Sequence, residues 1–261
     1  MVAMSIDPRA QAQLQQQLDA LLAQQRELVQ QLERGQGHFQ RLARSVWRVQ
    51  EEERRRLARE LHDGVGQNLT AIVRMLDHLL HELPDAAPTH AGLQQARALA
   101  EQTLADTRAL SRQLRPQILD DLGLFAALRW LARTFRDNHR IEVALDLVEP
   151  APSLSDDAET LIFRVAQEGL TNVARHAHAG AAQISLRAEN GHVVLRLRDS
   201  GSGCDVAQAL AAGSEGRSGG LGGMRDRVQL FGGRFHIDSS PGAGFRLEIE
   251  FPFSANTGTL A

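Results

Sequence analysis

The sequence predicts an α+β protein, with an N-terminal coiled coil and a dimeric four-helix bundle followed by an α/β sandwich. Three observations favour this fold class. Apolar residues repeat every 3.5 positions through the first fifty residues, two further amphipathic helices follow, and helical and alternating segments mix after Pro116. The chain has 261 residues, of which 43% are hydrophobic, so it can bury a sizeable core.

Residues 1–50 are predicted to form a coiled-coil signalling helix. Its seam consists of Leu14, Leu18, Leu21, Gln25, Leu28, Leu32, Gly35, Phe39, Leu42, Val46 and Val49. Gln25 and Gly35 are weak points in the seam, and Gly35-Gln36-Gly37 is expected to interrupt the helix. From Val49 to Leu57 the apolar step is eight residues, a stutter that locally unwinds a coiled coil. A Gln-rich helix lying on a globular domain is the alternative.

Residues 51–118 are predicted to form a helical hairpin. Apolar residues continue at helical spacing to Leu83, Pro84 ends the first helix, and a second amphipathic pattern runs from Leu93 to Ile118. Two antiparallel helices with one apolar stripe each cannot bury those stripes alone. A homodimer that forms a four-helix bundle would bury them.

Residues 119–252 are predicted to form the sandwich. The patterns indicate helices over 124–138 and 158–177, a helix starting at Met224, strands over 141–148 and 245–251, and a β-hairpin over 181–201. The dipeptide Asn190-Gly191 predicts the turn of that hairpin. Helices layered on a mixed sheet would result, and residues 253–261 form a polar tail.

Composition excludes several classes of protein. The formal net charge of −3 gives no indication of nucleic acid or anionic lipid as a partner, and the single Cys204 excludes an intramolecular disulfide. No apolar run approaches the ~20 residues that span a bilayer, and the N-terminus lacks a signal-peptide pattern. We expect a soluble, cytoplasmic chain without membrane contact, although a membrane-anchored parent whose sensor had been removed would look the same.

The first motif with chemical content is ELHDGVGQNL, residues 60–69. His62 follows Leu61 of the apolar stripe, so it is expected at the stripe's edge and accessible to solvent. The neighbouring Asp63 can hold the ring N–H and so increase the nucleophilicity of the other ring nitrogen. A solvated histidine on a helix surface is the alternative.

Two more motifs carry polar residues into the predicted core. Glu168 and Asn172 lie four residues apart on one helix, and the Asn172 amide oxygen can bind magnesium, or else bond to neighbouring backbone. Asp199 ends a predicted strand before Gly201 and Gly203, where a tight turn can approach a ligand. There its carboxylate can accept a hydrogen bond from an exocyclic amine.

A glycine-rich stretch, residues 217–233, precedes a predicted helix. Glycines surround Leu221, and their backbone N–H groups at a helix N-terminus can bind an anion. The segment between Gly203 and Gly219 is expected to be a mobile lid. A flexible linker is the alternative.

Together these motifs resemble those of bacterial two-component sensor histidine kinases that partner NarL-type response regulators. The resemblance covers roughly residues 50–252. ELHDGVGQNL resembles the phosphoacceptor box, QEGLTN the N box, and DSGSG, GGLGGMRDRV and SPGAGF the glycine boxes. Residues 114–132 are similar to the link into the catalytic ATP-binding domain, which would span 119–252.

The resemblance implies a role for each matching residue. His62 would be phosphorylated from ATP, and Asp63 would act as its general base or orient it. Gln67 would position water for dephosphorylation of the regulator. Asn172 would bind Mg²⁺, with Glu168 beside it. Asp199 would bind adenine, and the remaining nucleotide contacts would come from Arg175, Gly201, Gly203, Gly220, Leu221 and Gly222.

Two residues depart from the family pattern. Ser218 replaces the first glycine of the second box, and Phe245 replaces a common threonine after Gly244. Both leave the phosphate contacts open. The implied function is autophosphorylation of His62 from Mg-ATP and transfer to an aspartate of the regulator's receiver domain. A phosphatase-dominated family member and a non-catalytic ATP-binding scaffold are the alternatives.

Overall fold

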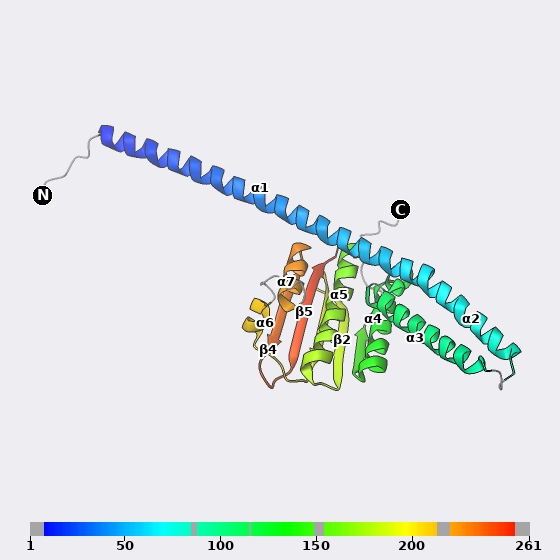
Figure 1. The fold of residues 1–261 in the computed structure, drawn as a ribbon. Coiled ribbons are helices and arrows are strands. Elements are labelled where there is room, and N and C mark those ends of the chain that lie inside the picture. The colour runs from blue at the N-terminus through cyan, green and yellow to red at the C-terminus, as the bar shows by residue number, and fades with distance from the viewer. Residues whose placement is uncertain (1–7, 85–87, 115, 149–153, 213–219, 254–261) are drawn as a thin grey trace, which may run out of the picture. The chain divides into compact units, whose positions relative to one another are not determined.

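The computed structural model describes residues 8–84, 88–114, 116–148, 154–212 and 220–253 (Figure 1). The chain divides into two compact units, residues 1–47 and 48–261. Helix α1 (Pro8–Glu60) is the first element, and the five strands of the described sheet all belong to the second unit. Across the described ranges, we find no helix with both the length and the apolarity required to cross a membrane.

Helix α1 runs without a break from Pro8 to Glu60, so the expected interruption at Gly35-Gln36-Gly37 is wrong. A glycine in a helix interior costs only about 1 kcal/mol relative to alanine, and the helix-forming residues on both sides offset that cost. Several seam side chains are more than half exposed: Leu21, Leu28, Leu32, Phe39, Leu42, Val46 and Val49. A row of exposed apolar side chains favours burial against a partner helix. The coiled coil itself stays a prediction.

The chain departs from α-helical geometry at the histidine. After α1, residues Leu61–Gly66 form a π-helical turn, and α2 (Gln67–Glu82) resumes the α-helix. A π-helical turn inserts one extra residue into a helix and is frequent at functional sites. The sequence places the change of phase earlier, between Val49 and Leu57, where the backbone stays α-helical.

Helices α2 and α3 (His90–Leu114) lie side by side as the predicted hairpin (Figure 1). The residue before Pro84, Leu83, is extended, which is the conformation that a residue before proline prefers. The Ser111 hydroxyl donates a 2.9 Å hydrogen bond to the carbonyl oxygen of Ala58 and so holds α3 against the end of α1. Val65, one of the apolar residues that repeat at helical spacing before Leu83, is exposed in the single chain, so its burial would require a second chain.

A five-stranded mixed sheet has the strand order β1-β2-β3-β5-β4. The strands are β1 (Glu142–Leu147), β2 (Ala181–Glu189), β3 (His192–Asp199), β4 (Arg234–Ser239) and β5 (Phe245–Pro252). Only β1 and β2 pair in parallel. Asn190 and Gly191 have φ values of 49° and 79°, as the predicted two-residue turn requires. The hairpin and the strands expected over 141–148 and 245–251 are confirmed.

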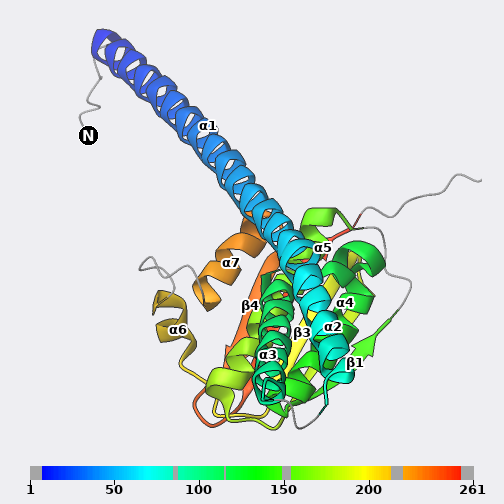
Figure 2. The same cartoon turned by 45° about the vertical axis from the view of Figure 1, so that its right-hand side comes forward.

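Helices cover one face of this sheet. Helices α4 (Gln117–His139), α5 (Asp156–Asn172) and α7 (Leu221–Leu230) pack against its strands (Figure 2). The strand residues that face them are fully buried and include Ile184, Leu186, Leu195, Leu197, Ile249 and Phe251. The alternate residues of the same strands are more exposed and mostly polar. The sheet is therefore two-faced, as expected for the predicted sandwich.

Three elements differ from the expectation. Strand β4 is not predicted, because its inward residues Phe235 and Ile237 are only half-buried and give a weak alternating pattern at the sheet edge. Helix α6 (Val206–Ala212) occupies the start of the expected lid. Residues 213–219 of that lid and 254–261 of the polar tail lie outside the described residues. Helix α7 starts three residues before Met224.

Candidate active site

His62 lies in the π-helical turn with its side chain half exposed, at 50%. Its Nδ1 lies 2.9 Å from Oδ1 of Asp63. Because a carboxylate only accepts, we assign the hydrogen of this bond to Nδ1. The lone pair of Nε2 is then available, which is what a nucleophile requires. The expected exposure of His62 and its contact with Asp63 are both present.

Two cavities adjoin His62, one of about 460 Å³ that Gln67 also lines, and one of about 230 Å³. The other charged residues of their linings are all arginines. Arg74 lines the larger cavity, Arg112 lines the smaller one, and Arg108 lines both. Apart from the Asp63 carboxylate at Nδ1, the charged side chains beside the imidazole in these cavities are therefore positive and suit a phosphoryl group or another oxyanion.

These three arginines are the functional candidates that sequence reasoning missed. Arg108 and Arg112 lie four residues apart on α3, so their shared helix face could have been recognised. Their position beside His62 could not have been predicted from the sequence, because it depends on how α3 aligns with α2. The apolar patterns of α2 and α3 are compatible with alignments that differ by one helical turn.

A third cavity, of about 270 Å³, lies where α5, β3 and α7 meet. Five predicted binding residues line it together: Asn172, Asp199, Gly203, Gly220 and Leu221. The four predicted residues outside its lining are Glu168, Arg175, Gly201 and Gly222. The lining also includes His176, Cys204 and Phe245, to which the sequence alone assigned no contact with a ligand. Most of the remaining lining is apolar.

Asp199 is the buried carboxylate of this third cavity, with 8% of the residue exposed. Burial raises the pKa of Asp199 above its ordinary value, and the backbone N–H of Gly201, which donates a 2.8 Å hydrogen bond to Oδ1, opposes that rise. A buried carboxylate costs folding free energy. Its presence in a largely apolar cavity is consistent with a role in binding a hydrogen-bond donor.

Gly201 and Gly203 allow the loop after β3 to approach other backbone closely. A Cβ atom on Gly201 would lie 2.2 Å from the carbonyl oxygen of Ala177, at the end of the π-helical turn that follows α5. Gly203 has a φ of +61°, and a Cβ there would lie 2.1 Å from the carbonyl oxygen of Ser240. Gly201 therefore shapes the cavity wall without lining it.

The start of α7 borders the same cavity. Gly220, with a φ of +130°, precedes the helix, and Leu221 is its first residue. The first backbone N–H groups of a helix have no intrahelical partner and favour an anion. Ser218, which departs from the family pattern in the second glycine box, lies outside the described residues. The same holds for its neighbour Gly219.

A buried ion pair links α1 to the helix that carries Asn172. Arg164 donates from Nε and Nη2 to Oε2 of Glu51 at 3.0 and 2.8 Å, and from Nη2 to the carbonyl oxygen of Leu114 at 2.6 Å. The side chains of Glu51 and Arg164 are only 7% and 11% exposed. Arg164, Glu168 and Asn172 follow at intervals of four on α5, so they share a helix face.

Glu168, one helical turn after Arg164 on α5, interacts electrostatically with α7. Its carboxylate acts on the Arg227 guanidinium, whose pKa is lowered by burial and partly restored by Glu168. Glu168 therefore interacts with α7 and is outside the lining of the third cavity. Within the part of the chain that the structure describes, the two cavities beside His62 and the third cavity share no lining residue.

Two models of known families match the chain. Residues 53–119 match a family described as "Histidine kinase", and residues 157–255 match "Histidine kinase-, DNA gyrase B-, and HSP90-like ATPase". The fold and these two matches thus define a protein that joins the helical hairpin of a histidine kinase to a domain of the histidine kinase-like ATPases. The chain belongs to the sensor histidine kinases.

Curated relatives carry the same description. The chain is 39% identical to the sensor histidine kinase MctS of Rhizobium johnstonii over 82% of its length, and 35% identical to the histidine-protein kinase/phosphatase UhpB of Salmonella typhimurium over 90%. It is 31% identical to the oxygen sensor histidine kinase NreB of Staphylococcus carnosus over 86%. The chain spans 46%, 46% and 63% of these three proteins.

Two solved histidine kinases have lower sequence identity to this chain. The histidine kinase domain of the blue-light activated EL346 protein from Erythrobacter litoralis is 18% identical with a TM-score of 0.43, and covers 72% of this chain and 94% of its own. AdeS of Acinetobacter baumannii is 15% identical with a TM-score of 0.42, over 72% and 96%.

Proposed function

We propose that this chain transfers the γ-phosphoryl group of ATP to Nε2 of His62 and then to an aspartate of a response regulator. The observation that carries the proposal is the pairing of an exposed imidazole, held at Nδ1 by Asp63, with a separate cavity that contains Asp199 and Asn172. The first supplies a nucleophile, and the second supplies contacts for a nucleotide.

The third cavity fits the adenine end of ATP. An apolar lining suits the purine ring, and the buried Asp199 carboxylate can accept from the exocyclic amine. The side-chain oxygen of Asn172 is an appropriate ligand for Mg²⁺, which keeps few protein ligands when it also binds phosphates. A bound Mg²⁺ would offset charge on the phosphate oxygens. The phosphates themselves would lie toward the start of α7.

The transfer needs little covalent chemistry from the protein. The lone pair of Nε2 forms a bond to the γ-phosphorus, the bond from that phosphorus to the bridging oxygen breaks, and ADP leaves with the electron pair. The phosphoryl group then moves from Nε2 to a carboxylate oxygen of the regulator. Among the described residues, the cavity for ATP and the cavities beside His62 have no lining residue in common. We therefore expect the ATPase domain to move toward a histidine of its own chain or of a partner chain.

Arg108 would stabilise the phosphoryl group on His62, because it lines both cavities beside the imidazole. We expect Arg108→Gln to lower the rate of phosphohistidine formation by about 10- to 100-fold, with little change in the KM for ATP. Arg108→Lys should restore part of the rate, and Arg59→Gln, an arginine outside both linings, should leave it unchanged. Equal loss in the Arg59 and Arg108 variants would contradict the role.

The finer assignments follow from this function. The regulator would be of the NarL type, and a homodimer would bury the exposed apolar residues of the hairpin. The domains would be 1–50, 51–118 and 119–252, with 253–261 as a tail. Since ATP and a response regulator are both found in the cytoplasm, this part of the protein would act there.

Gln67 supports a second activity, removal of phosphate from the regulator. It lines the same cavity as His62, where it could position water, and UhpB is named a kinase/phosphatase. Phe245, which departs from the family pattern, lines the third cavity. A poor fit of ATP beside Phe245 would make the phosphatase the main activity.

Incubation with Mg²⁺ and ATP labelled in its γ-phosphate tests the proposal. We expect the protein to acquire label that acid removes and base does not, as for a phosphohistidine. No label, together with loss of regulator phosphate that depends on Gln67, would favour the phosphatase. Binding of ADP without kinase or phosphatase activity would favour the non-catalytic ATP-binding scaffold.

A further inference from the structure

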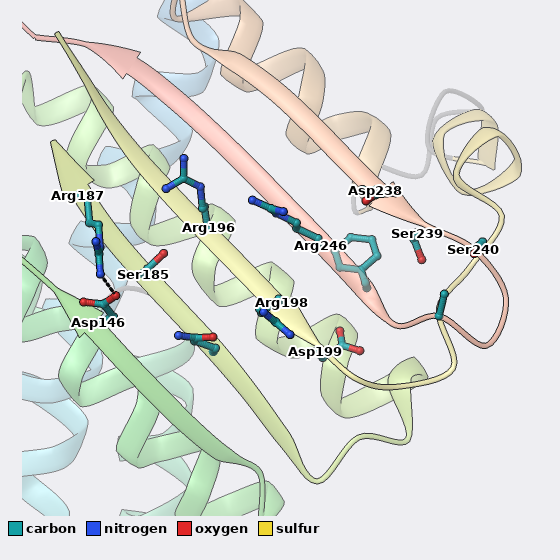
Figure 3. Close-up of a pocket in the computed structure, with 13 residues that line it drawn as sticks. Asp146, Ser185, Arg187, Arg196, Arg198, Asp199, Asp238, Ser239, Ser240 and Arg246 are labelled. Carbon is teal, nitrogen blue, oxygen red and sulfur yellow. Dashed lines mark hydrogen bonds and ion pairs between the residues drawn. The ribbon is translucent and has the colours of Figure 1, made fainter. Parts of the chain in front are cut away.

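The open face of the sheet carries a cavity that the proposed function does not use. It has a volume of about 490 Å³ and lies over β2, β3 and β5 on the face opposite the helices (Figure 3). Four arginines and three aspartates line it: Arg187, Arg196, Arg198, Arg246, Asp146, Asp199 and Asp238. The volume falls within the range of about 300–1,000 Å³ that is typical of small-molecule sites.

Two of these arginines are paired with carboxylates. Arg196 donates from Nε to Glu248 at 2.6 Å, and from Nη1 and Nη2 to Glu189 at 2.7 and 2.8 Å. Arg187 forms an ion pair with Asp146 through Nη2 (Figure 3). The charges of both arginines are therefore offset by neighbouring carboxylates, and Arg196 has little remaining capacity for a ligand.

Arg198 and Arg246 are different. Arg198 is exposed and makes no hydrogen bond or ion pair with any described residue. Arg246 only approaches Glu248 at 3.6 Å, and that carboxylate lies closer to Arg196. The two guanidinium groups thus retain most of their donors.

The positions of Arg198 and Arg246 in the sheet make their shortage of carboxylate partners destabilising. Arg198 and Arg246 stand directly opposite each other in the antiparallel pair of β3 and β5, and the other neighbour of Arg198 is Gln183 of β2. Like charges directly opposite each other destabilise a sheet. Asp238 stands opposite Arg246 on β4 but forms no ion pair with it in the described structure. An anion between the two arginines would remove the repulsion.

The hydroxyl groups of Ser185 and Ser240 add further donors to the lining. Asp199 and Phe245 line both this cavity and the third cavity, so the two cavities share a wall. We propose that the open face binds a small ligand with two or more oxyanion groups, held by Arg198 and Arg246 with help from these hydroxyls. Carboxylates and phosphates both match the guanidinium fork.

Citrate and inorganic pyrophosphate, without Mg²⁺ or nucleotide, are the probes. Calorimetric titration of the full chain at low ionic strength should give a Kd below about 1 mM for at least one of them. The double variant R198Q/R246Q should weaken that binding at least tenfold. R234Q is the matched control, since Arg234 lies on β4 of the same sheet face but outside the cavity, and it should change the Kd by less than twofold.

A second measurement separates this role from a structural one. Without added anion, Arg198→Gln should leave the Tm unchanged or raise it, because it removes a like-charge contact. The same variant should lose the rise in Tm that citrate or pyrophosphate gives the wild type. Preference for citrate would identify a polycarboxylate ligand, and preference for pyrophosphate a phosphorylated one. Binding of neither probe, or equal losses in R198Q/R246Q and R234Q, would overturn the proposal.

Discussion

Replacing His62 by glutamine is expected to abolish the acid-labile phosphate, lowering its rate of formation by at least about a thousandfold. Glutamine keeps polar atoms at this exposed position but has no lone pair that can form a stable bond to phosphorus. Because the His62 side chain is half exposed and, among the residues that the structure describes, bonds only to the neighbouring Asp63, the change should cost little stability. Affinity for ADP should remain unchanged, since His62 is not part of the third cavity.

His78→Gln provides the matched control. His78 is exposed on α2 and interacts with Glu82 at 3.3 Å, outside both cavities beside His62. The His78→Gln variant should acquire label to the same extent as the wild type. Label retained by the His62 variant and lost on His78→Gln would transfer the phosphoacceptor role to α2. Label retained by both variants would show that neither His62 nor His78 is the phosphoacceptor.

The sequence predicts the fold well wherever one physical pattern determines an element. The Asn190-Gly191 turn, the alternation of β2, β3 and β5, and the stop before Pro84 are local properties, and the structure reproduces each of them. The expected break at Gly35 fails because the propensity of two glycines is small beside that of a long helical segment.

The site is only partly predictable, because tertiary packing decides which residues meet. Asn172, Asp199 and Gly220 come from distant segments and line one cavity as expected. Glu168 shares a helix face with Asn172, yet it interacts with Arg227 and lies outside the cavity lining. The placement of Arg108 beside His62 depends on the alignment of two helices, which a periodic stripe does not determine.

Asp199→Asn is expected to weaken nucleotide binding and to stabilise the nucleotide-free protein. The carboxylate would accept from the adenine amine, and loss of one such charged hydrogen bond corresponds to about a 10- to 100-fold weaker affinity for ADP. The Asn side-chain oxygen can still accept from the N–H of Gly201. The variant therefore keeps the turn after β3 while it removes a buried charge.

The stability effect has a defined pH dependence. Burial raises the pKa of Asp199 in the native state, so the wild type loses stability as pH rises from the ordinary carboxyl pKa through the raised one. The advantage of the variant should be absent at acidic pH, where Asp199 is protonated in both states, and largest at neutral pH. Urea unfolding at several pH values measures it, with Asp238→Asn as an exposed control in the same sheet. If Asp199→Asn destabilised the protein at neutral pH while ADP affinity was retained, the carboxylate would be a structural group of the turn and adenine recognition would have to lie elsewhere.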